Sequence, residues 1–309
     1  MDNLLDILNK FSGQKVGIIG DLMLDRYLFC DIERISPEAP VPVARVRDEK
    51  YVLGGAANVA ANVQSLGGQA EVFGLIGADG KGDVMLKAFE NGGIGYRFSF
   101  SASNRPTTVK TRLIAGGQQV VRVDRESSEE ISSVEEERVL KRLPSFIEKI
   151  GVIIISDYAK GLVTNKIAEE VIKLAQERGI KVLSDPVSET FHKFKNSYLI
   201  KPNKKEAEQI SGMKFQKDYL NIKEIMDALH SRLAANLVVT LGKDGMATSD
   251  EGGIARIPTL AKEVFDVSGA GDTVMAALSL ALGAGGDLKT SALLGNYAAG
   301  IVVRKLGTA

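Results

Sequence analysis

Short apolar segments that end at Gly, Ser or Asp recur along this chain, and helix-like segments separate several of them. The first, KVGIIG at Lys15–Gly20, is typical of a strand that is buried on both faces of a parallel sheet. Similar runs lie at residues 70–77, 151–156, 180–184, 197–200 and 236–242. Because strands and helices alternate, we predict an α/β fold with a doubly wound parallel sheet and helices on both faces.

Two segments depart from this alternation. Residues 26–53 carry three prolines among alternating apolar residues, and residues 96–126 have the pattern of strands joined by the turn AGGQ. Both patterns predict β-structure outside the main sheet. We therefore expect one domain over residues 1–309, with a small antiparallel lid that these two insertions form at the strand ends, where open α/β sheets bind ligands.

Charge and cysteine content narrow the range of partners. The 39 basic and 39 acidic residues cancel and no block of Lys or Arg is present, so no nucleic-acid partner is expected. No apolar run approaches the roughly 18 to 20 residues that span a bilayer, so no membrane partner is expected either. The single Cys30 and the absence of a secretory apolar core near the first residue favour a cytoplasmic protein. A small molecule is the expected partner.

The segment DVSGAGD, Asp266–Asp272, places small residues between two acids, before the apolar run TVMAALSLAL. If a strand ends at Val267 and a helix begins at Gly271, the turn between them presents free backbone N–H groups to a phosphate, aided by the helix dipole. Asp272, in the first helical turn, can then accept a proton from an attacking hydroxyl. The alternative is that Asp and Ser only cap a closely packed helix, and the spacing alone does not separate the two interpretations.

Other phosphate and metal motifs are missing from the sequence. No G-x-x-x-x-G-K-[ST] is present, and Val274 stands where a dinucleotide pattern that starts at Gly269 requires glycine. His192 and His230 are far apart and lack neighbouring Cys residues, which argues against a zinc site or a Ser-His-Asp triad.

Two further motifs offer ligands for a sugar and a metal. In GGAANVA, Asn58 can bond a polyol, although close packing with Asn58 as a cap is an alternative. Asp21 and Asp25, in GDLMLD after the first strand, offer carboxylates to sugar hydroxyls, although either can instead begin a turn. In KPNKKEAE, Asn203 and Glu206 share one face of a first helical turn, where they can organise Mg²⁺ through water or form a capping box.

Together, and in this order, the motifs resemble those of the ribokinase-like (PfkB) carbohydrate kinases over essentially the whole chain. The resemblance implies a three-layer α/β/α sandwich with a small β-lid, and a sugar kinase that uses ATP and Mg²⁺. It implies Asp272 as the catalytic base, with Gly269, Ala270 and Gly271 as the anion hole. The implied sugar-binding residues are Asp25, Gly54, Gly55, Asn58 and Asp157. The implied nucleotide-side residues are Asn203 and Glu206, which also organise Mg²⁺ through water, and Thr240, Gly242, Gly245, Ser268 and Asn296.

Within this family, several segments resemble the D-glycero-D-manno-heptose 7-phosphate kinases, above all RISPEAPVPV, with TTVKTRLIAGGQQVVRVDRE and SDYAKG. Those enzymes make the 1,7-bisphosphate on the way to ADP-heptose, a precursor for lipopolysaccharide. The phosphate of such a substrate requires Arg or Lys at close range. The lid candidates are Arg34, Arg105, Lys110 and Arg112, and Lys110 and Arg112 lie on one strand face.

Some features bear on substrate and partners. Val187 follows Asp185-Pro186, where many kinases of this branch have Lys. No H-x-G-H-type nucleotidyltransferase motif is present, so we expect that activity on a fused or a separate partner. Exposed apolar lid strands predict a homodimer formed through the lid. The rival interpretations are another sugar or sugar-phosphate kinase of this fold, and a non-catalytic sugar- or nucleotide-binding regulator.

Overall fold

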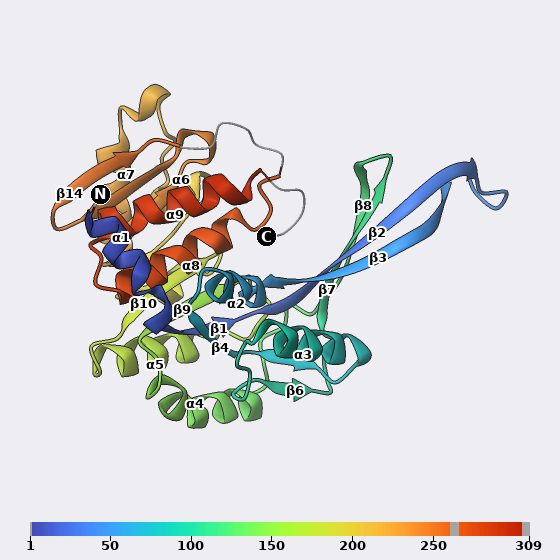
Figure 1. Cartoon of the computed structure of the whole chain (residues 1–309), viewed down its shortest axis with the longest axis horizontal. Coiled ribbons are helices and arrows are strands. Elements are labelled where there is room, and N and C mark those ends of the chain that lie inside the picture. The colour runs from blue at the N-terminus through green and yellow to red at the C-terminus, as the bar shows by residue number, and fades with distance from the viewer. Residues whose placement is uncertain (1, 260–265, 305–309) are drawn as a thin grey trace.

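A computed structural model describes residues 2–259 and 266–304 and confirms the predicted α/β sandwich (Figure 1). Over these residues the central sheet has eight strands in the order β14-β13-β12-β11-β10-β9-β1-β4. Neighbours from β4 to β12 pair in parallel, and β13 and β14 add an antiparallel edge. The strands are β1 Lys15–Gly20, β4 Gln69–Phe73, β9 Val152–Asp157, β10 Lys181–Pro186, β11 Leu199–Ile200, β12 Asn236–Thr240, β13 Met246–Asp250 and β14 Gly253–Ile257.

Strand β1 shows why such short apolar runs form the sheet. Val16 and Ile18 belong to the hydrophobic cluster on one face and Ile19 to the cluster on the other, as the two-residue period of a strand requires. Gly17 has no side chain because Phe146 fills that space: a Cβ at Gly17 would lie 2.7 Å from Phe146 Cζ. Both faces of the strand are therefore covered, which accounts for the lack of polar residues after Lys15.

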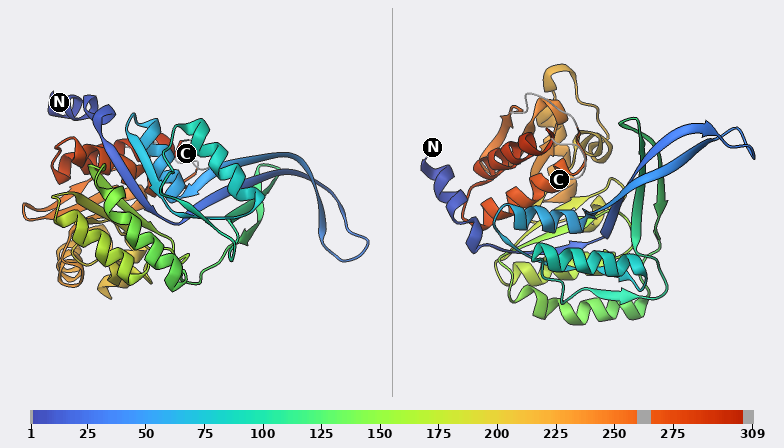
Figure 2. Two further views of the ribbon diagram at one scale, coloured as in Figure 1. Left: turned by 90° about the horizontal axis from the view of Figure 1, so that it is seen from below. Right: turned by 45° about the vertical axis from the view of Figure 1, so that its right-hand side comes forward.

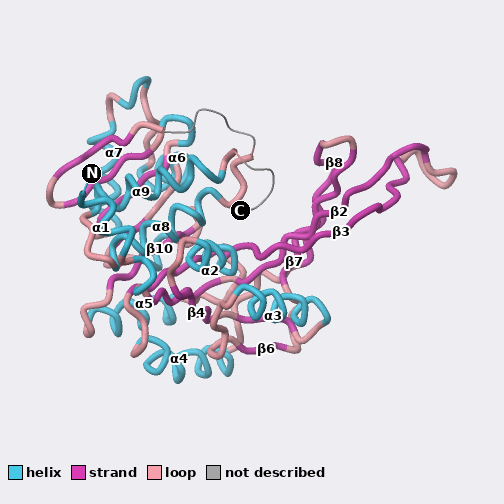
Figure 3. Tube along the Cα trace, in the orientation of Figure 1, coloured by secondary structure: helices cyan, strands magenta, loops and turns pink. Residues whose placement is uncertain are grey.

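Helices cover both faces of the sheet (Figures 1 and 3). Helices α1, α2, α3, α8 and α9 contribute to the cluster that contains Ile18, and α4 to α7 contribute to the cluster that contains Ile19. The helices are α1 Asp2–Asn9, α2 Ala56–Ser65, α3 Gly80–Gly92, α4 Ser133–Ile147, α5 Asn165–Gln176, α6 Lys204–Ser211, α7 Ile222–Leu233, α8 Ala270–Gly283 and α9 Leu288–Val302.

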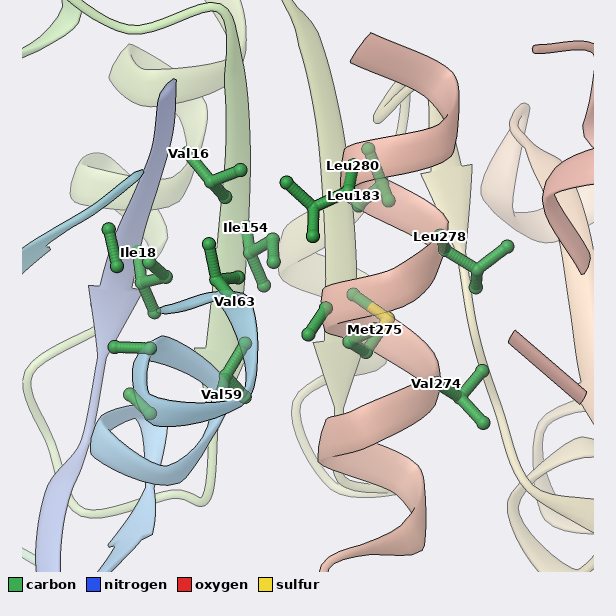
Figure 4. Close-up of a cluster of buried hydrophobic side chains, with 14 of the residues drawn as sticks. Val16, Ile18, Val59, Val63, Ile154, Leu183, Val274, Met275, Leu278 and Leu280 are labelled. Atoms are coloured by element: carbon green, nitrogen blue, oxygen red, sulfur yellow. The ribbon is translucent and has the colours of Figure 1, made fainter. Parts of the chain in front are cut away.

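Helices α2 and α8 lie on the same face of the sheet. Figure 4 shows Val63 of α2 beside Ile154 of β9, and Leu280 of α8 beside Leu183 of β10. Helix α8 is apolar on nearly all sides, and its residues 272–282 are all buried. Any charged group in its first turn is therefore held inside the protein.

The predicted lid is confirmed as a four-stranded sheet in the order β3-β2-β7-β8. Figures 1 and 2 show this sheet projecting from the body, with the β2–β3 hairpin extending furthest. The lid strands are β2 Leu22–Ile35, β3 Pro42–Gly55, β7 Thr108–Ala115 and β8 Gln118–Arg125.

Several expected details are wrong. The first lid hairpin extends beyond residues 26–53 at both ends, and β2 and β7 pair in parallel. In the second expected insertion, β6 (Phe100–Ala102) pairs with β5 (Leu75–Gly77) outside the lid. The run at 70–77 is interrupted at Gly74, where a Cβ would lie 2.4 Å from the Leu22 side chain. Asp266 and Val267 are not in a strand, and residues 260–265 lie outside the described part of the chain.

Candidate active site

Buried carboxyl groups gather where the parallel strands β1 and β9 end, next to the first turn of α8. Asp21 follows β1, Asp157 is the last residue of β9, and Asp272 is in α8. All three are buried. The carboxyl ends of parallel strands share one edge of the sheet, and this is where open α/β sheets bind ligands. The arrangement identifies the candidate site from burial and charge alone, because isolated buried carboxylates are costly.

Asp272 has a donor on each carboxylate oxygen. Asn58 Nδ2 donates to its Oδ2 at 2.7 Å, and Tyr158 Oη donates to its Oδ1 at 2.8 Å. Burial raises the pKa of Asp272 to about 6; the charge of Asp185 adds to this, and the two hydrogen bonds oppose it. A carboxylate with this pKa is a better proton acceptor than an exposed Asp and is still largely ionised at neutral pH.

The loop before α8 is half-buried, and Gly269 has a left-handed backbone (φ 78°) that favours glycine. The expectation that all its N–H groups point outward is wrong for two of them. The N–H of Ser268 donates to Asp266 Oδ1 at 2.9 Å, and that of Ala270 donates to the Val267 carbonyl at 3.2 Å. Gly271 is open enough that a Cβ there would be 3.6 Å from its nearest neighbour, Lys201 Nζ.

Helix α2 holds the first turn of α8 through side-chain amides. Asn58 is fully buried rather than protruding, and besides Asp272 its Oδ1 accepts from Asn62 Nδ2 at 3.3 Å. Asn62 in turn accepts from Thr273 Oγ1 at 2.7 Å. Gly55, before α2, has φ 56°, and a Cβ there would lie 2.6 Å from the Asp21 carbonyl oxygen. The small residues of this motif thus permit close packing around the carboxylate.

The turn after β9 is fixed by two carboxylates. Asp21 Oδ2 accepts from the backbone N–H groups of Tyr158 at 2.8 Å and Lys160 at 3.0 Å. Asp157 Oδ1 accepts from the N–H of Ala159, whose φ of 55° is unusual for a residue with a side chain. Burial, followed by the charge of Asp157, raises the pKa of Asp21 to about 6. Both acids therefore help to hold the turn, and Asp157 does so through only one of its oxygens.

A buried ion pair lies on the other side of Asp272. Lys201 Nζ contacts Asp185 Oδ1 at 2.9 Å, and Lys201 is 4% exposed. Burial opposes the charge of Lys201, but Asp185 outweighs it, so the pKa of Lys201 lies above its usual value. The ammonium group is therefore a fixed positive charge beside the loop before α8.

Two of the four predicted phosphate-binding cations of the lid, Arg112 and Lys110, pair with carboxylates. Arg112 pairs with Asp25. Lys110 contacts Asp124 at 3.3 Å and Glu126 at 3.1 Å. Of the other two candidates, Arg105 donates to backbone carbonyls, and Arg34 is exposed far along the β2–β3 hairpin.

A cavity of about 550 Å³ lies between the lid and the loop before α8. Its polar lining includes Arg47, Lys50, Arg112, Asp31, Asp266 and Ser268. The lid therefore brings three cationic side chains to the same space as the DVSGAGD loop, and two of them, Arg47 and Lys50, were not among the candidates from the sequence.

The capping-box interpretation of Asn203 and Glu206 is confirmed. The Glu206 N–H donates to Asn203 Oδ1 at 3.0 Å, and the Asn203 N–H donates to Glu206 Oε2 at 2.8 Å. Burial raises the pKa of Glu206, and the nearby charge of Asp185 acts in the same direction. A capping box and a role in holding Mg²⁺ through water are compatible, because the box uses only one of the two Glu206 oxygens and only one lone pair of Asn203 Oδ1.

The expected nucleotide-side loop follows β12. Thr240 forms an isolated bridge with Asn203, which joins this loop to the start of α6. Gly242 and Gly245 both have positive φ, and a Cβ at Gly245 would lie 2.1 Å from the Ile257 carbonyl oxygen. Asn296 in α9 is buried and donates to the Pro258 carbonyl at 2.7 Å. Its side-chain nitrogen therefore fastens the end of β14 in this structure.

The motifs of the sequence do not identify two residues that act on Asp272, Tyr158 and Lys201. Both occur inside quoted motifs, SDYAKG and KPNKKEAE, but neither motif shows that its residue approaches Asp272. The available signal was their position directly after apolar runs that end at the same sheet edge.

Comparisons with known proteins agree with this geometry. A sequence profile described as "pfkB family carbohydrate kinase" matches residues 14–309. Proteins called "Bifunctional protein HldE" are similar: that of Sulfurimonas denitrificans is 41% identical over 99% of this chain, and that of Helicobacter hepaticus is 43% identical over 96%. The chain spans only 64% and 61% of those two relatives, which is less than two thirds of their length.

Solved structures share the fold. Arabidopsis thaliana ribokinase, complexed with ribose and ATP, superposes with a TM-score of 0.74 at 20% identity, covering 96% of this chain and 94% of the ribokinase. Escherichia coli phosphofructokinase-2 in complex with potassium gives a TM-score of 0.78 at 20% identity, with 96% and 94% covered. In the described residues, no helix is both long and apolar enough to cross a bilayer.

Proposed function

Because this chain belongs to the pfkB family of carbohydrate kinases, we propose that it transfers the γ-phosphoryl group of ATP to the anomeric C1 hydroxyl of D-glycero-D-manno-heptose 7-phosphate. The product is the 1,7-bisphosphate, used for ADP-heptose. One observation carries the reaction type: Asp272 is a buried carboxylate in the first turn of α8, directly after the glycine-containing loop that borders the lid cavity. A proton acceptor and an anion-binding helix end are thus adjacent.

In the proposed reaction, Asp272 accepts the proton of the sugar C1 hydroxyl as that oxygen bonds to the γ-phosphorus. The bond from the γ-phosphorus to the bridging oxygen breaks, and ADP leaves with the electron pair. The dipole of α8 and the backbone of Gly269 and Gly271 would stabilise charge on the transferring group. Ala270 would contribute once its N–H leaves the Val267 carbonyl and turns to the phosphate. Closure of the lid would exclude water, which competes with the sugar as acceptor.

The charges around the loop fit a bound divalent cation. Asp185, Glu206 and Asp272 interact electrostatically with Lys201, so three carboxyl groups share one ammonium group. Asn203 and Glu206 would hold Mg²⁺ through water, and Thr240, Gly242, Gly245, Ser268 and Asn296 would face the nucleotide. When bound, Mg²⁺ neutralises negative charge on the phosphates. Among the described residues no three acids or histidines are close enough together to ligate a metal directly, so the proposed cation would be held through water.

Two features support a phosphorylated heptose as the acceptor. Arg47, Lys50 and Arg112 line the lid cavity and can bind a phosphate. Several segments of the chain resemble the heptose 7-phosphate kinases. The sugar side of the site would consist of Asp25, Gly54, Gly55, Asn58 and Asp157. Because Asn58 is completely buried and donates to Asp272, it would act on the sugar through Asp272 and not by direct contact.

The proposed partners follow from coverage and surface. We propose a nucleotidyltransferase, fused to this kinase or separate from it, as the partner activity. The similar proteins are called bifunctional and extend well beyond the part that this chain matches. A homodimer through the lid would cover Val120, Val121 and Val123 of edge strand β8, which are 49%, 45% and 60% exposed. We propose a cytoplasmic location, which agrees with the proposed use of ATP.

The test of this proposal is ADP release with ATP and Mg²⁺ in the presence of D-glycero-D-manno-heptose 7-phosphate, fructose 6-phosphate, ribose or no sugar. ³¹P NMR identifies the position of the new phosphate. Heptose-dependent turnover to the 1,7-bisphosphate supports the proposal. Preference for another sugar would retain the kinase and reject the heptose, and binding of ATP without turnover would favour a regulator.

A further inference from the structure

Tyr158 connects the turn after β9 with the candidate base. Its hydroxyl donates to Asp272 Oδ1 at 2.8 Å, while Asn58 occupies the other carboxylate oxygen. Tyr158 as a whole residue is half-buried, and its phenol group is under the electrostatic influence of three acids, Asp272, Asp185 and Asp25. Burial, followed by the charges of Asp272 and Asp185, raises the pKa of Tyr158 well above its usual range. The phenol therefore remains protonated and can only donate to the carboxylate.

The backbone of Tyr158 is fixed independently of this bond. Asp21 accepts its N–H and that of Lys160, and Asp157 holds the N–H of Ala159. The left-handed Ala159 and Gly161 (φ 55° and 89°) permit the sharp turn that follows. These hydrogen bonds fix the backbone of the turn and so hold the Tyr158 side chain toward Asp272. Packing of an aromatic ring alone would not require a turn fixed by two buried carboxylates.

From this geometry we infer that Tyr158 is a positioning residue: its hydroxyl orients the Asp272 carboxylate and keeps it ionised for proton acceptance. The inference rests on the proposed kinase function. Tyr158 itself gains or loses no proton during the reaction; the proton of the sugar hydroxyl goes to Asp272. Each oxygen of Asp272 already accepts one hydrogen bond, from Asn58 or from Tyr158. The sugar proton would therefore go to a remaining lone pair of one of these oxygens.

A hydroxyl that only stabilises packing could make the same 2.8 Å contact with Asp272, so the experiment must measure the pKa of the Asp272 carboxyl group itself. The groups that act on Asp272 are Tyr158 from the β9 turn, Asn58 from α2, Asp185 from β10 and Lys201 from the segment before α6. Removing the hydroxyl of Tyr158 deletes one stabilising donor and leaves the other three groups in place.

The experiment compares Tyr158→Phe with the wild-type chain. We expect kcat to fall about tenfold to a hundredfold, as for loss of a hydrogen bond to a charged group, with KM for ATP within about twofold. The acid limb of the kcat profile should move to higher pH. Tyr96→Phe is the matched control, because it also removes a hydroxyl that donates to a carboxylate, Glu90 Oε1 at 2.8 Å, outside the site.

A direct measurement keeps the test independent of the sugar. The Asp272 carboxyl ¹³C shift, assigned with Asp272→Asn, gives the pKa of this group in wild-type and Tyr158→Phe protein without turnover. A higher pKa in the variant supports the inference, and an unchanged pKa with unchanged kcat overturns it. If the heptose is not a substrate, the same comparison uses whichever sugar reacts.

A second substitution retains the ring and the hydroxyl. 3-Fluorotyrosine at position 158 has a more acidic phenol and is the stronger donor, so it should move the acid limb to lower pH. Movement in the same direction as in Tyr158→Phe would show that perturbed packing, rather than donation, causes the change, and would refute the positioning role.

Discussion

Asn58 and Asp272 are 214 positions apart in the sequence and are joined by a buried hydrogen bond of 2.7 Å from Nδ2 to Oδ2. The bond connects the first turn of α2 to the first turn of α8, which approach each other because both helices pack on one face of the sheet. An amide is the appropriate partner here: it donates to the carboxylate and adds no charge to a region that already holds Asp185 and Asp272.

Asn58→Asp should therefore destabilise the fold. Two adjacent buried carboxylates cannot both be ionised, so the unfolding free energy at pH 8 should fall by about 3 kcal/mol. The folded-state pKa of the added group is raised, so the loss should be smaller at pH 5, where the pair retains a proton. Urea unfolding at the two pH values measures this. Asn91→Asp, at an exposed position in α3, is the control and should change stability by less than about 0.5 kcal/mol.

The raised pKa of Asp272 predicts opposite pH effects on activity and stability. Proton acceptance requires the ionised form, so kcat/KM should fall as the pH drops through about 6. Stability should change the other way. Between pH 4 and 6 the native state binds the proton that the unfolded state has lost, and this group therefore lowers stability by about 3 kcal/mol as the pH rises.

Asp272→Asn separates these two effects. Activity should fall by about 10²–10⁴-fold, the usual contribution of a general base. The unfolding free energy at pH 7 should not fall, and its slope between pH 4 and 6 should be reduced but not abolished, because Asp21, Asp185 and Glu206 also have pKa values raised by burial. Near-normal turnover, or an unchanged slope, would contradict the assignment of Asp272.

Glu206→Gln distinguishes the capping role of this residue from a role with Mg²⁺. Glutamine can retain the capping box, so the melting temperature should change little. Loss of the charge should raise the Mg²⁺ concentration needed for half-maximal activity by about tenfold or more. Glu135→Gln, in the matching capping box with Ser132 of α4, should leave both quantities unchanged. An unchanged Mg²⁺ requirement in Glu206→Gln would leave this residue only as a cap.

The sequence predicted the layers of the fold because the two-residue and helical periods record local burial. Val16, Ile18 and Ile19 are apolar for the reason that was inferred: they lie on opposite, covered faces of β1. Boundaries such as the break at Gly74 depend on contacts with Leu22, a residue distant in the sequence, and no local pattern contains that information.

The site was predicted in part for a similar reason. Asp272 and its loop form a local strand-end and helix-start pattern, which short segments can reveal. Tyr158 and Lys201 approach Asp272 only because β9 and β10 are neighbours in the sheet and β11 follows, an order that the sequence does not state. Asn58 was found but assigned to the sugar, because its motif gives no sign that α2 packs against α8 rather than opening to solvent.

Arg112→Ala tests whether the lid cavity binds the phosphate of the sugar. Arg112 pairs with Asp25 and lines the lid cavity, so its guanidinium group is held at the cavity and not in bulk solvent. Without it, KM for the heptose phosphate should rise by about tenfold or more, while KM for ATP stays within about twofold. An unphosphorylated heptose should show no such loss, because it has no phosphate for the arginine to contact. Arg122→Ala, opposite Arg112 on β8, removes an exposed lid cation as the control. Equal increases in KM for sugar and ATP would mean that Arg112 supports the shape of the lid, through Asp25, and does not recognise the phosphate.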